Sequence, residues 1–119
     1  MVPEHTIYYT EIVTSDVTAT CALYAKTHGW RFQPMEPALG NARVAVLPDG
    51  SRWGVRAPLR ADERPIVRTY IRVQNIEHAA QTVEEDGALV ALPPMEIPGH
   101  GTIAIYIHGG IEQGLWELP

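Results

Sequence analysis

The sequence repeats one pattern at an interval of about half its length. Residues 10–16 precede a helical run that ends at Gly29, and residues 69–75 precede a second run that ends at Gly87. The offsets are 69 − 10 = 59 at the first residue and 87 − 29 = 58 at the glycine, in a chain of 119 residues. A unit with one helix and a few strands buries only one side of its sheet, so two such units are expected to pack together.

Each repeat predicts a strand, a helix and three further strands. In the first repeat the strands are expected over 6–13, 30–35, 42–47 and 52–57, with a helix over 17–27 that the Asp16 side chain caps. In the second repeat they are expected over 67–73, 88–92, 102–107 and 113–118, with a helix from the Asn75 cap to Asp86. The Pro93-Pro94 pair should end the strand over 88–92 in a rigid loop. The prediction is an α+β fold, one domain over 1–119, with repeats over 6–57 and 67–118 and a linker over 58–66.

Composition and charge exclude several classes of protein. The net charge of −5 opposes binding to nucleic acid, although seven of the nine Lys and Arg residues are arginines between positions 43 and 72. A single cysteine, Cys21, excludes an internal disulfide and argues for the cytoplasm. The start of the chain lacks a signal-peptide pattern, and no apolar run reaches the roughly 20 residues that span a bilayer, so no membrane association is expected.

Several phrases resemble one known superfamily in their order and spacing. They are Asp16, Leu23-Tyr24 and His28-Gly29-Trp30 in the first half, and Tyr70 to Ile76, Pro93-Pro94, Ile97 to Gly101 and Gly114 to Glu117 in the second. Together they resemble the vicinal oxygen chelate superfamily of glyoxalase I, bleomycin-resistance proteins and extradiol dioxygenases. The resemblance implies two βαβββ modules that form a curved mixed sheet with a central cleft, a divalent metal in that cleft, and a homodimer.

The superfamily's metal ligands do not carry over to this chain. Counting from the caps and strand ends places the four ligand positions at Tyr9, Gly54, Arg68 and Gly114. Glycine has no side chain and a guanidinium has no lone pair to donate, so the sequence predicts a divergent member without a metal cofactor. A shift of two residues leaves an alternative open, in which Mn, Fe, Ni, Zn or Mg is bound by Glu11 and Glu112 with His100 or His108.

Strand alternation predicts a cleft rich in arginine. If Tyr9 and Arg68 face the cleft, further side chains should share it, namely Glu11, Arg52, Arg56, Tyr70, Arg72 and Trp116. His100, in a loop between glycines, could close over a ligand. Arginines beside aromatic rings suit a small anion, but arginines can equally serve only to solvate a sheet face. Glu11 is a candidate general base, and we prefer the interpretation that it pairs with Arg68 or Arg72.

These residues are compatible with three functions. The first is a metal-free glyoxalase-like protein that binds a small anionic or aromatic molecule in the arginine-lined cleft. The second is a divalent-metal-dependent lyase, isomerase or dioxygenase that uses Glu11 and a histidine. The third is a non-catalytic dimerising module, since an exposed sheet edge invites pairing with a second copy.

Overall fold

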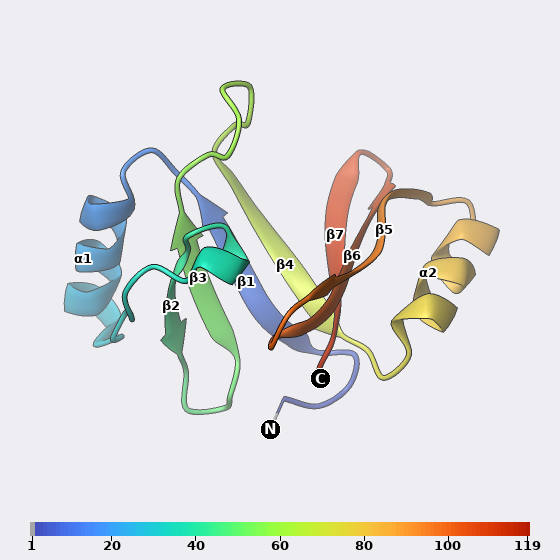
Figure 1. Ribbon diagram of the computed structural model, residues 1–119, viewed down its shortest axis with the longest axis horizontal. Coiled ribbons are helices and arrows are strands. Elements are labelled where there is room, and N and C mark those ends of the chain that lie inside the picture. Colours follow the sequence, from blue (N-terminus) through green and yellow to red (C-terminus); the bar gives the residue numbers. More distant parts are fainter. Residues whose placement is uncertain (1) are drawn as a thin grey trace. The chain divides into compact units, whose positions relative to one another are not determined.

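The structure is a computed structural model that describes residues 2–119, and it has the predicted α+β class (Figure 1). The elements in chain order are β1 (Ile7–Val13), α1 (Val17–His28), the short 3₁₀ helix η1 (Pro37–Leu39), β2 (Arg43–Val46), β3 (Arg52–Arg56), β4 (Ile66–Arg72), α2 (Ile76–Glu85), β5 (Leu89–Ile97), β6 (Gly101–His108) and β7 (Ile111–Glu117). Neither α1 nor α2 has the length and apolar character that crossing a membrane requires.

The chain folds into two compact units that repeat one arrangement. Unit 1 consists of Tyr9–Val67, and unit 2 consists of Val2–Tyr8 with Arg68–Pro119. In unit 1 the strand order is β2-β3-β1, with β1 parallel to β3 and β2 antiparallel to it. In unit 2 the order is β4-β7-β6-β5, with β4 parallel to β7 and the other pairs antiparallel. Each unit therefore forms a mixed sheet in which its first strand pairs with its last, as an internal repeat predicts.

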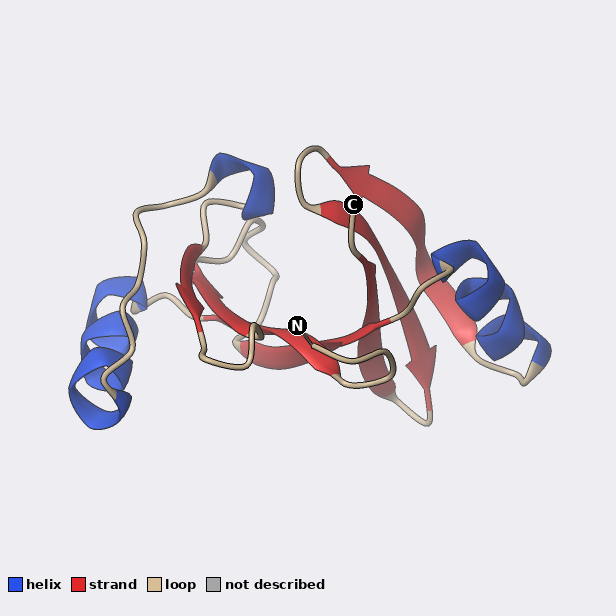
Figure 2. Ribbon diagram, turned by 90° about the horizontal axis from the view of Figure 1, so that it is seen from below, coloured by secondary structure: helices blue, strands red, loops and turns tan. Residues whose placement is uncertain are grey.

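Each sheet is covered on one face by the helix of its own unit (Figure 2). In unit 1, Cys21 of α1 packs against Ile12 of β1 and Val55 of β3, and Trp53 adds to this cluster. In unit 2, Ile76 of α2 joins a buried cluster with three strand residues, which are Val73, Ala104 and Leu115. Because side chains alternate along a strand, these contacts fix which residues face away from the helix.

The two helices begin in different ways. The Asp16 carboxylate was expected to cap α1, but the side chain makes no cap hydrogen bond, and the Asp16 backbone N–H instead donates to Thr14 Oγ1 at 3.1 Å. At α2 the predicted cap forms, with Asn75 Oδ1 accepting from His78 N at 3.0 Å. Glu117 Oε1 also accepts from Ile76 N at 2.9 Å, so the end of β7 satisfies a second free N–H of α2.

The strand predicted over 30–35 is not formed. The segment between α1 and η1 is irregular, and Gln33 N donates one backbone hydrogen bond, to Val44 O at 2.9 Å. Arg43 Nε also donates to Gln33 O at 3.2 Å, so a side chain contributes to holding this segment. Pro34 has no N–H to donate and therefore interrupts a strand ladder here.

The prolines of the second repeat do not end a strand as predicted. β5 runs through Pro93-Pro94 to Ile97, and its pairing with β6 shifts register between Val90 and Leu92 and again between Leu92 and Met95. β5 lies at the edge of the unit 2 sheet. An edge strand tolerates prolines because one of its sides needs no N–H donors, and the irregular register absorbs them.

Candidate functional site

The residues that face away from α1 in unit 1 form a polar surface, which we call arginine face 1. They lie on β1 and β3, whose parallel register pairs Tyr9 with Arg52 and Glu11 with Gly54, and Arg56 completes the set. Arg52 is half-buried at the start of β3, whereas the Arg56 side chain is almost completely buried. Arg56 therefore controls the chemistry of this face.

Arg56 holds two carboxylates from different parts of unit 1. It is 6% exposed, and its Nε donates to Glu11 Oε2 at 2.8 Å. Its two terminal nitrogens donate to Glu63 Oε1 and Oε2 at 2.9 and 2.8 Å, in a bidentate arrangement. Glu11 forms an ion pair with Arg56, which was not among the predicted partners, because the pairing of β1 with β3 brings Arg56 within reach. The pairing of Glu11 with Arg68 or Arg72 stays a prediction. Glu11 as a general base stays a prediction.

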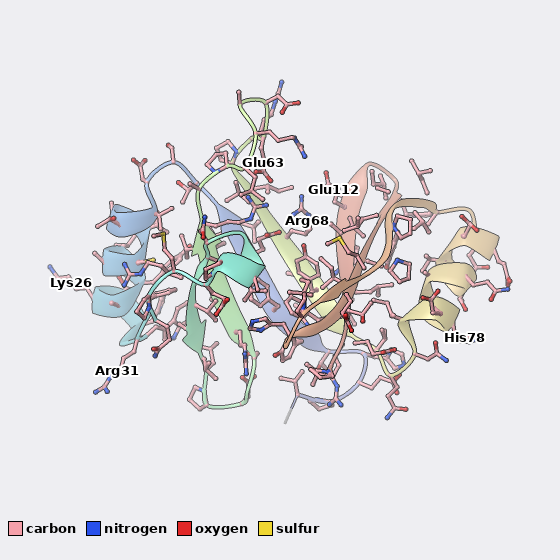
Figure 3. The ribbon with its side chains drawn as sticks, viewed as in Figure 1. Lys26, Arg31, Glu63, Arg68, His78 and Glu112 are labelled. Atoms are coloured by element: carbon pink, nitrogen blue, oxygen red, sulfur yellow. The ribbon has the colours of Figure 1, made fainter. Side chains whose placement is uncertain are left out.

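Glu63 is a functional candidate that the sequence pattern did not reveal. It lies in the loop between β3 and β4 that was interpreted as a featureless linker (Figure 3). Its Oε1 also accepts from Leu59 N at 2.6 Å. One carboxylate therefore links two positions of the loop to each other and to Arg56. The hydrogen bonds from Arg56 lower the pKa of Glu63 to about 2. No periodicity marks such a residue, and an acid among prolines and arginines was the only signal.

The depressed pKa of Glu63 predicts a specific loss of stability in acid. Its stabilising effect is complete above the pKa of an unfolded glutamate and disappears as the pH falls toward 2, since only the unfolded state takes up a proton in that window. We expect the free energy of unfolding to fall by up to about 3 kcal/mol between about pH 5 and 2 through this group. Urea unfolding at several pH values measures it. Glu63→Gln should remove this part of the pH dependence, and an unchanged slope in Glu63→Gln would contradict the assignment.

The residues that face away from α2 in unit 2 form a second polar surface, which we call arginine face 2. The register of β4 and β7 pairs Tyr70 with Gly114 and Arg72 with Trp116. Arg68 and Glu112 extend this face by alternation and form an ion pair, in which Arg68 Nε and Nη2 donate to Glu112 Oε1 at 3.0 and 2.7 Å (Figure 3). The predicted residues Arg68, Tyr70, Arg72 and Trp116 are thus brought together on one face of one sheet.

Arg72 lies where the N-terminal segment crosses the end of β4. Its backbone N–H donates to Thr6 O at 2.9 Å, and its carbonyl accepts from His5 N at 2.8 Å. One terminal nitrogen of its side chain donates to Val2 O. The Nε–H of Arg72 is buried and has no hydrogen-bond partner among residues 2–119. A buried guanidinium donor of this kind calls for an acceptor that residues 2–119 do not supply.

The aromatic residues of the predicted site are buried beneath these faces. Trp116 is 3% exposed and packs edge-on against Tyr8 and Tyr70, with ring centroids 5.3 and 5.5 Å apart. Its indole Nε1 donates to His100 O at 2.8 Å, which anchors the turn between β5 and β6. Tyr9 and Tyr70 are each 4% exposed. Because they are buried, these rings offer little exposed surface to a ligand.

The two strand glycines at predicted ligand positions lie under tyrosine rings. A Cβ at Gly54 would overlap the hydroxyl end of Tyr9, and a Cβ at Gly114 would overlap the Tyr70 ring at Cγ, Cδ2 and Cε2. The same combination of a first-strand tyrosine over a last-strand glycine therefore occurs in both units. A side chain large enough to bind a metal cannot be accommodated at either glycine unless the tyrosine moves.

The alternative metal set is not assembled. Within the part of the chain that the structure describes, no three or more His, Cys, Asp or Glu residues form a group that could hold a metal ion. The register of β6 and β7 pairs Ile107 with Glu112 and His108 with Ile111, so His108 and Glu112 lie on opposite faces of the unit 2 sheet. The hypothesis that both reach one metal was therefore wrong, since their positions are separated by an odd number of residues along the paired strands. The donor set does not fit the metal that the fold implies.

The arrangement of elements places the chain among known folds: it has the fold of the vicinal oxygen chelate superfamily, as the sequence predicts. One similar structure is a hypothetical protein from Bacillus halodurans C-125, with a TM-score of 0.78 and 17% identity over 96% of this chain and 94% of that one. Another is methylmalonyl-CoA epimerase from Mycobacterium tuberculosis, with a TM-score of 0.77 and 16% identity over 100% and 93% of the two chains.

A third similar structure is a methylmalonyl-CoA epimerase variant from Streptomyces coelicolor in complex with 2-nitronate-propionyl-CoA. It has a TM-score of 0.71 and 16% identity, over 98% of this chain and 99% of that one. No protein-family model and no curated protein sequence matches this chain. At this level of identity the likeness concerns the fold, and the chemistry of the site depends on the residues present in this chain.

Proposed function

We propose that the protein binds a small organic acid, free or as an acyl thioester, on arginine face 2, and that it does so without a metal ion. The observation that carries the proposal is the buried Nε–H of Arg72, which has no acceptor among the described residues. An anionic oxygen would satisfy this donor and add a charge-assisted hydrogen bond. The same face supplies Arg68, whose planar fork suits a carboxylate, and so two cationic groups serve one ligand.

The pairing of the individual arginines makes face 2 a better site for an anion than the Arg56 network of face 1. On face 1, Arg56 is neutralised by Glu11 and Glu63, which leaves its fork fully occupied. On face 2, Arg68 and Arg72 are accompanied by Glu112, and the two hydrogen bonds that Arg68 donates to Glu112 go to one oxygen of that partly exposed carboxylate. An incoming acid can therefore share or replace the Glu112 contact at moderate cost, because a partly exposed ion pair contributes little stability.

The comparisons support an acid of this kind. Variants of the Streptomyces coelicolor enzyme of the same fold are described in complex with 2-nitronate-propionyl-CoA, and a nitronate is an anionic group. A further structure of this fold is a methylmalonyl-CoA epimerase in complex with methylmalonyl-CoA. Both free acids and thioesters are therefore sensible first probes, and an aromatic acid tests whether the ligand's body can be flat.

We expect Arg72→Gln to weaken binding of such an acid by about 10- to 100-fold, since a charged hydrogen bond contributes about 1.5–3 kcal/mol. Isothermal titration with methylmalonate, benzoate and methylmalonyl-CoA, each with and without EDTA, measures the affinity and distinguishes free acid from thioester. Arg31→Gln is the matched control, because Arg31 is an exposed arginine outside both faces (Figure 3). Equal affinities for wild type, Arg68→Gln and Arg72→Gln would refute the site, and loss of binding in EDTA would refute its metal independence.

A further inference from the structure

Unit 2 has a cavity on the face opposite to arginine face 2. Its volume is about 360 Å³, which is within the range of small-molecule sites. It lies between the C-terminal end of α2 and the hairpin of β6 and β7, and its lining includes Val83, Asp86, Tyr106, His108 and Ile111. None of these residues has a role in the site proposed above, so the cavity is a separate feature.

The walls of the cavity combine apolar groups with a few polar ones. Val83 and Ile111 contribute branched aliphatic surface, and Tyr106 contributes an aromatic ring that is partly buried against the unit 2 core. Gln113 closes one side, and its Nε2 donates to Thr69 O at 2.7 Å, so its amide is fixed in place. A largely apolar wall with few polar groups suits a ligand with a compact hydrocarbon or aromatic body.

The electrostatics of the cavity select the charge of the ligand. α2 ends at Asp86, its last turn contains no basic residue, and Glu84 and Glu85 precede the cap. The C-terminal end of a helix carries a partial negative charge, to which these carboxylates add. Asp86 and His108 are the titratable acid and base among the lining residues, and no arginine or lysine among residues 2–119 lines the cavity. A cation is therefore attracted to this end of α2 and an anion is repelled.

We infer that this cavity binds a small organic cation, an ammonium group on an aromatic or branched aliphatic body. The ammonium lies against the Asp86 carboxylate, and the body lies against Tyr106, Val83 and Ile111. Tyr106 adds a favourable interaction between its ring face and the positive charge. The ligand is opposite in charge to the acid proposed for arginine face 2, so the two sites do not compete for one molecule.

Titration of the full ¹⁵N-labelled chain with phenethylammonium chloride tests this inference by NMR. We expect chemical-shift changes confined to residues 83–88 and 106–113, with 2-phenylethanol binding at least about fivefold more weakly and phenylacetate causing no change there. Asp86→Asn should weaken ammonium binding by about tenfold or more. Asp62→Asn, at a carboxylate that is 85% exposed in unit 1, and Arg72→Gln should leave it unchanged.

A second variant keeps the test independent of any effect of Asp86→Asn on folding. Ile111 is 66% exposed, so Ile111→Trp should be tolerated by the fold while it fills the cavity. We expect it to abolish the shift changes from both phenethylammonium and 2-phenylethanol. The inference is overturned if the changes fall elsewhere, if the alcohol binds as tightly as the ammonium, or if neither variant alters the affinity.

Discussion

Replacement of Arg56 by methionine should lower the free energy of unfolding by about 3–5 kcal/mol, which is the usual cost of removing one partner from a buried ion-pair network. Methionine cannot replace the guanidinium, which donates to Glu11 through Nε and to Glu63 through both terminal nitrogens. Without it, Glu11 and Glu63, whose side chains are nearly buried, lose the charged hydrogen bonds that Arg56 donates to them. Urea unfolding at neutral pH, followed by circular dichroism, measures the change.

Arg60 provides the matched control for Arg56. It also pairs with a carboxylate, Asp62 at 3.2 Å, but the two side chains are 72% and 85% exposed. Arg60→Met should therefore change stability by less than about 1 kcal/mol. If Arg56→Met and Arg60→Met have similar small effects, the network around Arg56 does not stabilise unit 1 and the loop closure by Glu63 has another cause.

Gly114→Ala should lower the free energy of unfolding by about 2–3 kcal/mol through overpacking. The added Cβ overlaps the base of the Tyr70 ring, and that ring cannot swing away because it packs edge-on against Trp116 at 5.5 Å. Gly54→Ala should cost less, because its Cβ meets only the hydroxyl end of Tyr9. Thermal and urea unfolding of both variants gives the order.

A double variant tests the cause of the Gly114 effect. In a Tyr70→Leu background the ring is gone, so the added cost of Gly114→Ala should fall below about 1 kcal/mol. An additive result, with the same cost in both backgrounds, would show that the strand rather than the tyrosine excludes a side chain at this position.

The fold was largely predictable because it depends on local patterns. The repeat offset, the cap at Asn75 and the stop at Gly29 each act over a few residues, and the structure confirms the two helices to within a residue or two. Gly29 has a φ of +73°, which explains why a glycine ends α1. The strand predicted over 30–35 is not formed, and Pro34, which has no N–H to donate, interrupts a ladder in this segment.

The candidate site was predictable only as a set of faces. Alternation correctly grouped Arg68, Tyr70, Arg72 and Trp116, since residues two apart share a side of a strand. Alternation could not show that Trp116 is buried or that Glu11 pairs with Arg56, because these facts depend on which strands are neighbours. The role of Glu63 could not be predicted for the same reason, since its pairing with Arg56 depends on how an irregular loop folds back.

The prolines of β5 have a consequence for how this chain can associate. β5 is the free edge of the unit 2 sheet, and Pro93 and Pro94 present no N–H there. A strand from a second copy could form regular hydrogen bonds only with the short stretches on either side, 89–92 and 95–97. The edge is therefore a poor template for the addition of a continuous strand. This protects the chain against aggregation through strand pairing, which a long regular edge strand promotes.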